Sequence, residues 1–197
     1  MVLLMVYQLY YYLRYINFSN RKYIESNQST LPKVSVVVCA HNERENLENY
    51  LHTLLSQDYP EYEVIVVDDE SEDNSLIVLE QYARQYPNFY HTFVPQGARV
   101  ISSKKLALTI GIKAAHYDYI LLTDADCRPE SRNWIREMMK GYDHESTEMV
   151  IGFSPYFERE TLLSGLISYD TLFHGLQYMG MARAGHPYMG VGRNLSY

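Results

Sequence analysis

The sequence has few cysteines, little positive charge and no long hydrophobic run, and each shortage excludes a class of protein. Two cysteines among 197 residues, Cys39 and Cys127, are too few for a disulfide-stabilised scaffold and are typical of a reduced domain. Lys and Arg number 17 against 24 acidic residues, and the net charge of −7 argues against binding to a nucleic acid polymer. With 47% hydrophobic and 21% charged residues, the chain is instead typical of one packed domain.

Several motifs of known chemistry are also missing. No G-x-G-x-x-G follows the first predicted strand, which leaves a dinucleotide-binding fold of the usual kind unsupported. The sequence also has no G-x-x-x-x-G-K-[ST], no G-x-S-x-G, no H-E-x-x-H and no paired C-x-x-C. Any site must therefore be found from the placement of polar residues on the fold.

The N-terminal segment differs from the rest of the chain. Residues 1–13 are almost entirely apolar, contain several tyrosines and are followed by the basic residues Arg14, Arg21 and Lys22. The run is shorter than the ~20 residues of a membrane-spanning helix, but tyrosines and flanking positive charge are typical of a membrane interface. We expect residues 1–25 to form the cytoplasmic end of a membrane helix or an interfacial helix. A helix that covers an apolar patch of the domain is the alternative.

Strand-like and helix-like segments alternate through the rest of the chain. Apolar runs rich in β-branched residues predict strands buried on both faces at residues 34–40, 63–67, 117–123 and 149–153, with a weaker strand at 89–94. Helical periodicity predicts helices over residues 43–55, 74–86, 104–115, 132–139 and 161–181, the last of them long and amphipathic. This alternation predicts an α/β, Rossmann-like fold whose mostly parallel sheet is flanked by helices on both faces.

Polar clusters directly follow three of the predicted strands. They are the segments 39–43, 68–71 and 124–126. The carboxyl ends of parallel strands meet at one edge of a sheet, and ligands of open α/β sheets bind at that edge. We therefore expect these three clusters to form one ligand site.

Asp124 and Asp126 are the candidate metal ligands. In an extended segment, residues two apart share a face, so both carboxylates could meet one divalent cation. Mg²⁺ or Mn²⁺ held by one or two carboxylates plus substrate phosphates fits the chemistry of these hard cations. Capping of the following turn is the alternative role for this pair.

Asp69, Lys104 and His41 are further candidates, each with an ordinary alternative. Asp69 can accept a hydrogen bond from a base or a ribose, or it can belong with Asp73 to a loop and helix cap. Lys104 and Lys105 open a predicted helix and can hold a phosphate there, or they can be a solvated basic pair. A lone histidine such as His41 is more often structural.

Four segments from Pro32 onward occur in the order known from one enzyme family. They are PKVSVVVCAHNERENLENYLHTLLSQDYPEYEVIVVDDESEDNS, SKKLALTIGIKAA, YILLTDADC with its D-x-D triplet, and MGVGRNLSY. Together they resemble family 2 glycosyltransferases, whose GT-A fold binds a nucleotide-sugar. Residues 26–33 are mostly polar and contain Pro32, which predicts a linker into the domain. The resemblance implies a nucleotide-sugar-binding core at 34–160 and a helix with the start of an acceptor region at 161–197.

The resemblance also assigns roles to single residues. The implied nucleotide-sugar-binding set is Cys39, His41, Glu43, Asp69, Lys104 and Asp124; the metal set is Asp126 with Asp124; the acceptor-region set is Gly190, Gly192 and Asn194. In the family, the aspartate at Asp69 reads the base, often uracil, and the lysine at Lys104 lies near the diphosphate. Cys39 and His41 depart from the pattern, since many members have Thr or Pro and Tyr there.

The activity implied by the resemblance is an inverting, metal-dependent sugar transfer. The donor would be a nucleotide-diphospho-sugar, UDP-linked, the acceptor a hydroxyl of a glycan or lipid-linked molecule, and the cofactor Mg²⁺ or Mn²⁺. No catalytic base is identified. In the family the base follows the acceptor segment, so we expect it beyond Tyr197. We therefore expect this chain to be a truncated, donor-binding half. We expect the cytoplasmic face of a membrane as its location, with a soluble cytoplasmic protein as second choice.

Three other functions stay open at this point. A non-catalytic nucleotide-binding module would keep the donor site without turnover. A phospho-receiver domain also gathers acids and a lysine, but its acidic pair follows the first strand. A sugar-nucleotide nucleotidyltransferase expects a glycine-rich loop after the first strand, where this chain has HNERENL. The transferase interpretation requires Asp69, Lys104 and Asp126 to meet around one pocket.

Overall fold

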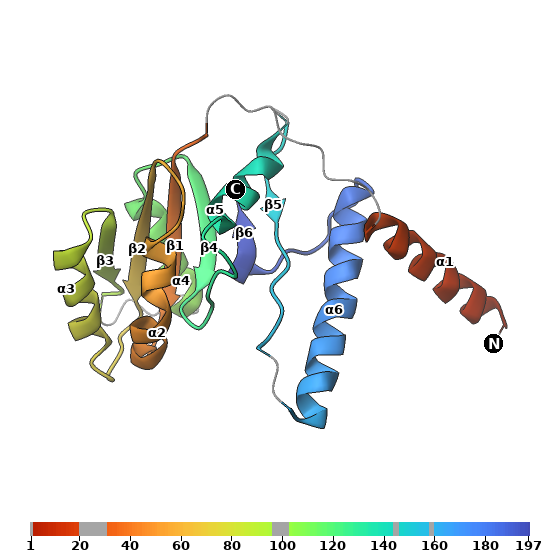
Figure 1. Ribbon diagram of the computed structural model, residues 1–197, viewed down its shortest axis with the longest axis horizontal. Coiled ribbons are helices and arrows are strands. Elements are labelled where there is room, and N and C mark those ends of the chain that lie inside the picture. Colours follow the sequence, from red (N-terminus) through yellow and green to blue (C-terminus); the bar gives the residue numbers. More distant parts are fainter. Residues whose placement is uncertain (1, 20–30, 96–102, 144–145, 158–159) are drawn as a thin grey trace. The chain divides into compact units, whose positions relative to one another are not determined.

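A six-stranded sheet organises the part of the chain that the structure describes. The computed structural model describes residues 2–19, 31–95, 103–143, 146–157 and 160–197. Within them the strand order is β3-β2-β1-β4-β6-β5 (Figure 1). The strands are β1 (Val34–Ala40), β2 (Tyr62–Asp68), β3 (Phe89–Phe93), β4 (Tyr119–Asp124), β5 (Val150–Ile151) and β6 (Leu195–Ser196). β1 to β4 pair in parallel, whereas β6 is antiparallel to both β4 and β5. The predicted α/β fold with a mostly parallel sheet is confirmed.

Helices cover both faces of the parallel strands, as predicted. They are α2 (Arg44–Leu55), α3 (Ser75–Gln85), α4 (Ser103–Ala114) and α5 (Trp134–Met139). Alternate residues of a strand face opposite sides, and β1 divides its valines accordingly. Val36 and Val38 belong to the core shared with α2, α3 and α5, whereas Val37 packs against Leu108 and Ile112 of α4.

The close approach of α4 to the sheet depends on a glycine. A Cβ added to Gly111 would lie 2.4 Å from Val37 Cγ1 and 3.0 Å from Val67 Cγ2. No larger residue fits there without movement of the sheet or of the helix. Gly111 therefore sets the distance between the helix and the sheet, and with it the height of the α4 N-terminus over the strand ends.

The last two strands differ from the sequence prediction. The segment 149–153 was expected to be a strand buried on both faces, but only Val150–Ile151 is a strand and both residues are half-buried. That expectation is wrong because β5 lies at the edge of the sheet and pairs only with β6 among the described strands. β6 itself was not predicted, since two residues carry no readable periodicity.

The chain divides into two compact units. One comprises Asn27–Gly152 and Gly192–Tyr197 and contains the sheet; the other comprises Met1–Ser26 and Phe153–Val191. The predicted boundaries at 1–25, 26–33, 34–160 and 161–197 stay predictions. Residues 20–30, which include Arg21, Lys22 and most of the expected linker, lie outside the described residues.

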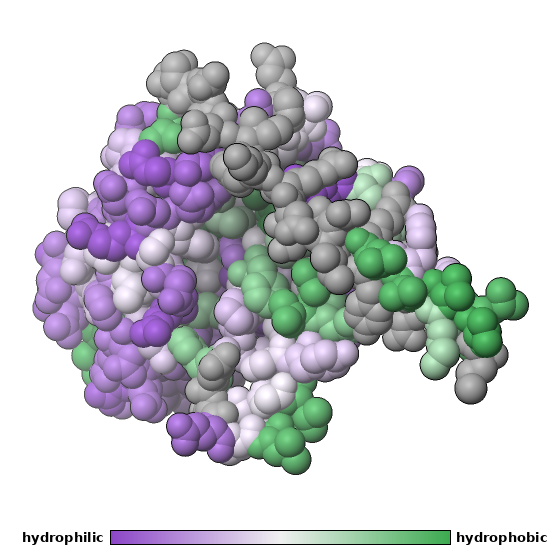
Figure 2. Space-filling view, turned by 45° about the vertical axis from the view of Figure 1, so that its right-hand side comes forward, coloured by the Kyte–Doolittle hydropathy of each residue, from purple (hydrophilic) through white to green (hydrophobic). Residues whose placement is uncertain are grey.

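The described residues of the second unit form two helices, α1 (Val2–Ser19) and α6 (Leu162–Arg183), which contact each other. The Thr161 hydroxyl caps α6 by accepting a hydrogen bond from the Ser164 backbone N–H at 3.1 Å. α1 stays apolar at its surface, with Leu3 85% and Leu4 72% exposed (Figure 2, green). Among the described helices, none combines the length and the apolar character needed to cross a bilayer.

Candidate functional site

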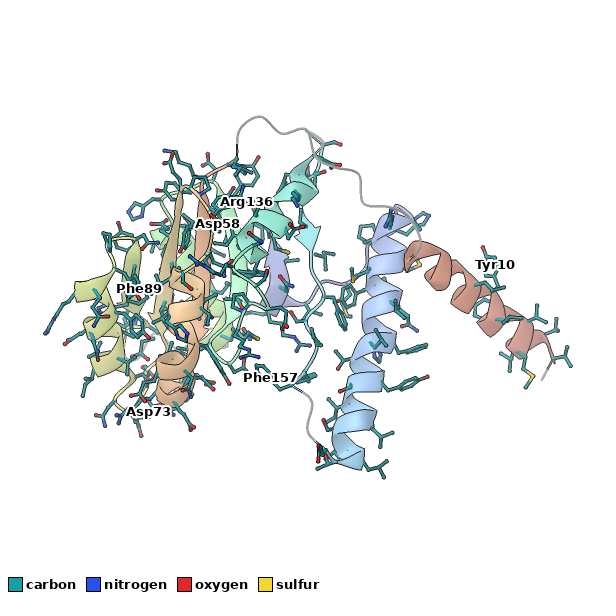
Figure 3. The ribbon with its side chains drawn as sticks, in the orientation of Figure 1. Tyr10, Asp58, Asp73, Phe89, Arg136 and Phe157 are labelled. Carbon is teal, nitrogen blue, oxygen red and sulfur yellow. The ribbon has the colours of Figure 1, made fainter. Side chains whose placement is uncertain are left out.

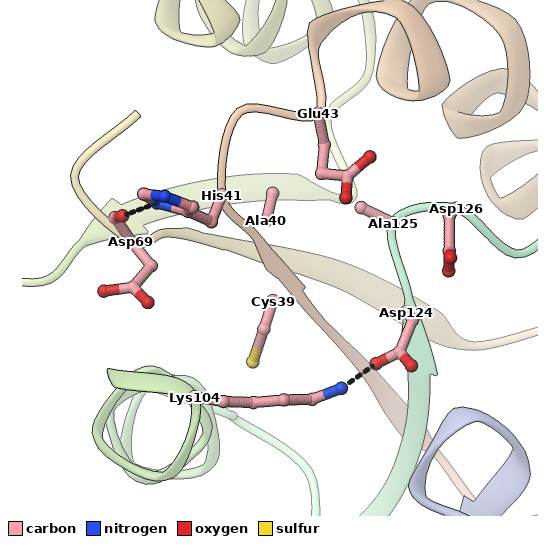
Figure 4. A pocket seen from close by; sticks show the side chains of 9 residues that line it. All are labelled: Cys39, Ala40, His41, Glu43, Asp69, Lys104, Asp124, Ala125 and Asp126. Carbon is pink, nitrogen blue, oxygen red and sulfur yellow. Dashed lines mark hydrogen bonds and ion pairs between the residues drawn. The ribbon is translucent and has the colours of Figure 1, made fainter. Parts of the chain in front are cut away.

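A pocket of about 240 Å³ opens at the carboxyl edge of the parallel strands. It is lined by Cys39, Ala40, His41, Glu43, Asp69, Lys104, Asp124, Ala125 and Asp126 (Figure 4). These include all seven residues that the sequence assigned to the nucleotide-sugar and the metal. Asp69, Lys104 and Asp126, the three residues that had to meet, do so.

Strand register explains how distant residues come together here. β1 lies between β2 and β4, with Ala40 opposite Asp68 and Cys39 opposite Asp124. The residues after the three strand ends therefore share one rim. Figure 4 shows His41 and Asp69 on one side of the pocket and Asp124 and Asp126 on the other. Lys104 comes from α4, which packs on the face of the sheet opposite to α2, α3 and α5.

Among the described residues that line the pocket, Lys104 is the cation, and it is paired with Asp124. Its Nζ lies 2.8 Å from Asp124 Oδ1. Burial by itself lowers the pKa of Lys104, but the hydrogen bond and charge of Asp124, with a smaller contribution from Asp126, raise the pKa above its usual value overall. The lysine is therefore fully charged at neutral pH and stands at the same end of the pocket as the D-x-D carboxylates.

Burial disfavours the thiolate form of both cysteines at this edge of the sheet. Burial raises the pKa of Cys39 to about 11. Burial, together with Asp126, raises the pKa of Cys127 to about 12. Because only the thiolate is a nucleophile, neither cysteine is suited to covalent chemistry at neutral pH. Cys127 instead donates through its thiol to Asp126 Oδ1 at 3.4 Å.

The opposite end of the pocket is built around Asp69. This residue is 7% exposed, and its backbone N–H donates to the Ala40 carbonyl at 2.8 Å. Its own carbonyl oxygen lies 2.5 Å from His41 Nδ1. The backbone of Asp69 is thus held on both sides, and its carboxylate faces the pocket (Figure 4).

The loops after β1 and β2 are bound to each other by side chains. Asp73, labelled in Figure 3, accepts hydrogen bonds from Arg44 N at 2.8 Å and from Ser75 N and Oγ at 3.1 and 2.5 Å. Asp73 therefore accepts from the first backbone N–H group of both α2 and α3, whereas Asn74, which begins α3, makes no side-chain cap bond. The Asn42 backbone N–H donates to Ser71 Oγ at 2.8 Å. These contacts give the pocket rim a defined shape.

A divalent cation fits this donor set. Among the described residues, four carboxylates and one lysine line the pocket, so a diphosphate that enters alone would meet an excess of negative charge from them. Among the described residues, no group of three or more His, Cys, Asp or Glu side chains could hold a metal by itself. Asp124 and Asp126 suit a cation that completes its shell with phosphate oxygens, which is how Mg²⁺ is usually bound.

The acceptor-region residues lie outside this pocket. Asn194 is 8% exposed, and its Oδ1 accepts from Trp134 Nε1 at 3.0 Å. A Cβ added to Gly152 would lie 2.3 Å from Asn194 Nδ2, so Asn194 is packed closely. Gly190 and Gly192 are exposed. The role of these three residues in acceptor binding stays a prediction.

Sequence reasoning missed two lining residues, Ala40 and Ala125. Each lies between polar residues that were predicted, and each is nearly buried, at 1% and 6% exposure. The signal was present, because a small side chain between two polar strand-end residues leaves room for a ligand. Their small size opens the floor of the pocket.

The fold of this chain is similar to that of solved glycosyltransferases. The mannosyltransferase PcManGT of Pyrobaculum calidifontis, solved with GDP-Man and Mn²⁺, matches with a TM-score of 0.72 over 96% of this chain and 51% of its own, at 20% identity. TarS of S. aureus, solved with UDP-GlcNAc, matches with a TM-score of 0.54 over 66% of this chain and 36% of its own, at 24% identity. At these identities the likeness shows the fold alone.

The chain belongs to glycosyl transferase family 2, whose family model matches residues 35–188. The poly-beta-1,6-N-acetyl-D-glucosamine synthase of Staphylococcus epidermidis is 29% identical over 117 residues, which cover 59% of this chain and 27% of that protein. Glycosyltransferase AglE of Haloferax volcanii is 29% identical over 126 residues, covering 63% of this chain and 40% of that protein. The chain thus spans between a quarter and two fifths of these curated relatives.

Proposed function

We propose that this chain binds the donor of an inverting glycosyltransferase, a UDP-linked sugar, in the pocket at the carboxyl edge of the sheet. The observation that carries the proposal is the meeting of Asp69, Lys104 and Asp126, from three separate elements, around one cavity. Family membership makes a nucleotide-sugar the appropriate ligand. Asp69 is our candidate for the group that accepts a hydrogen bond from the base.

The two ends of the pocket suit the two ends of a nucleoside diphosphate. His41 and Asp69 offer a ring and a carboxylate to the base, while Glu43 is available to the ribose. Lys104 offers a point charge to the diphosphate from the first turn of α4, where backbone N–H groups also favour an anion. The GDP-linked donors of other glycosyltransferases are the competing ligands.

The transfer itself needs charge compensation at the leaving group. In this proposal, Asp126 and Asp124 would hold Mg²⁺ or Mn²⁺, which supplies positive charge against the diphosphate as it leaves. Lys104 adds a second positive charge on the same side. An acceptor hydroxyl, from a glycan or a lipid-linked molecule, would attack the anomeric carbon; none of the pocket carboxylates is assigned as its base.

The test is titration of the 197-residue chain with UDP and GDP, each with and without Mn²⁺. We expect UDP to bind only with Mn²⁺, and Asp126→Ala to weaken it at least about tenfold, since a lost charged contact is worth ~1.5–3 kcal/mol. The matched control is Asp118→Ala, an exposed aspartate in the segment before β4.

Three results would count against the proposal. Equal UDP affinity with and without Mn²⁺ would show that donor binding does not depend on a metal. Tighter binding of GDP than of UDP would reassign the donor. No binding of either nucleotide would overturn the donor site itself. Sugar transfer by the chain alone would show that turnover needs no base from elsewhere.

We further propose that α1 places the protein at the cytoplasmic face of a membrane. Support comes from its exposed apolar side chains and from the basic residues that follow residue 13. Co-sedimentation with anionic vesicles, lost when residues 1–19 are removed, is the expected result. Equal sedimentation without this segment would contradict it.

A further inference from the structure

The loops after β1 and β2 share an unusual backbone feature. Asn42 and Glu70, two residues beyond their respective strand ends, both have a φ of 55°. This left-handed region costs an ordinary residue ~1 kcal/mol and is easiest for glycine and asparagine. Asn42 contacts the loop after β2 through its backbone N–H, which donates to Ser71 Oγ, and through its side chain.

A chain of side-chain hydrogen bonds links these loops, with a backbone group at each end. The Glu72 backbone N–H donates to Asn42 Oδ1 at 2.7 Å. Because that atom accepts, the other side-chain group of Asn42 is its NH₂, which lies 3.3 Å from His41 Nε2. At the far end, His41 Nδ1 lies against the Asp69 carbonyl oxygen.

The two ends of this series of hydrogen bonds require the same tautomer of His41. A carbonyl oxygen only accepts, so the His41 Nδ1 must carry a proton. An amide NH₂ only donates, so Nε2 must be free of one. Both conditions are met by the neutral Nδ1–H tautomer, and every bond then runs in one direction, from Glu72 through Asn42 and His41 to Asp69.

We infer that Asn42 is a positioning residue of the donor site, which selects the Nδ1–H tautomer of His41 and through that ring fixes the backbone of Asp69. The inference rests on the proposed function, in which the Asp69 carboxylate contacts the base. Asn42 lies within the polar segment 39–43, but the sequence assigned no role to it. Its effect on the ligand is indirect, because it acts through the carbonyl that His41 holds.

Asn42→Asp tests this with little change to the backbone. Aspartate also tolerates the left-handed region, and it can still accept from the Glu72 N–H. It cannot donate to His41, so it favours a proton on Nε2. The neutral variant Asn42→Gly keeps the left-handed backbone conformation and removes both side-chain hydrogen bonds of residue 42. It therefore controls for the added charge of the aspartate. Asn74→Asp is the matched control, at another left-handed asparagine (φ 66°), which begins α3 without a side-chain cap bond.

Two readouts separate positioning from a merely structural role. Long-range ¹H–¹⁵N correlation on ligand-free protein reads the tautomer of His41, and calorimetry reads UDP affinity in Mn²⁺. We expect Nδ1–H in the wild-type chain and a proton on Nε2 in Asn42→Asp. Both Asn42 variants should bind UDP about fivefold more weakly, equivalent to ~1 kcal/mol, and Asn74→Asp should match the wild type.

Several outcomes would overturn the inference. One is an Nε2–H tautomer in the wild-type chain. Another is unchanged UDP affinity in Asn42→Asp despite an altered His41 signature. A third is a loss of affinity as large in Asn74→Asp. If the wild-type chain binds neither UDP nor GDP, the proposed function fails and the positioning role fails with it. The tautomer of His41, measured without ligand, then shows whether the hydrogen bonds from Glu72 through Asn42 and His41 to Asp69 exist.

Discussion

The two edges of the parallel sheet both carry buried acids, but they use them differently. At the amino edge, Glu63 is 3% exposed and accepts from Ser35 Oγ at 2.5 Å and from the His116 backbone N–H at 2.8 Å. Its second oxygen lies 2.7 Å from His116 Nδ1. At the carboxyl edge, Asp69 faces an open pocket, and Asp68 Oδ1 is buried with no hydrogen-bond partner among the described residues.

The difference separates structural acids from acids available to a ligand. Glu63 has both carboxylate oxygens in contact with groups of its own chain, so it is a structural acid. Acids with unused acceptor positions beside a cavity cost stability unless a ligand occupies them. Variants at the two edges should therefore divide into losses of stability and losses of binding.

The largest expected effect is at the amino edge. Glu63→Ala leaves Ser35 and His116 without their buried partner and should lower the free energy of unfolding by about 3 kcal/mol. Glu61→Ala is the matched control: Glu61 is exposed and its one ion pair among the described residues is with Lys33, so the variant should cost less than about 1 kcal/mol. Urea denaturation measures both. Similar losses for the two variants would show that Glu63 is not structural.

The next effect is at the carboxyl edge and concerns binding. Lys104→Met removes the pocket's cation and should weaken UDP binding in Mn²⁺ about tenfold, ~1.4 kcal/mol. Its stability should hardly change, because the Lys104 side chain is 69% exposed. Lys105→Met, at the adjacent exposed lysine, serves as the control in the same titration. A tenfold loss there too would indicate a general charge effect.

The smallest effect tests a structural acid at the carboxyl edge itself. Burial alone would raise the pKa of Asp73. The hydrogen bonds from Ser75 and Arg44 lower the pKa by more than burial raises it, so that it lies below the usual 3.8. Its stabilisation is therefore present above pH 3.8 and is lost as pH falls through the lower folded value. Asp73→Asn should cost about 1 kcal/mol at pH 7 and progressively less towards pH 3. A cost independent of pH would show that the charge is irrelevant.

The central strands could be predicted from the sequence because burial on both faces leaves a continuous apolar run. β1 matches the predicted 34–40, and β2 extends one residue beyond each end of 63–67. The pocket followed from the same rule, since polar residues directly after such runs must lie at one edge. Short edge strands such as β5 and β6 lack that signal.

The hydrogen bonds and backbone conformations around the pocket could not be predicted. The left-handed backbone of Asn42 occurs together with hydrogen bonds between loops about thirty positions apart, such as the one between Asn42 and Glu72. Asn194 fitted a family motif, yet its contacts to Trp134 and Gly152 arise only once β6 has joined the sheet. Both features are products of tertiary packing and leave no local pattern.

The position of β6 between β4 and β5 has a consequence for synthesis on the ribosome. The strands β1 to β4 can assemble once Asp124 has emerged, because each finds its neighbour among residues already made. β5 emerges long before its only described partner, so Val150 and Ile151 must wait unpaired until Leu195 leaves the exit tunnel. Co-translational folding should therefore proceed in two stages, and the nascent sheet is open to chaperones or to mispairing at β4 in between.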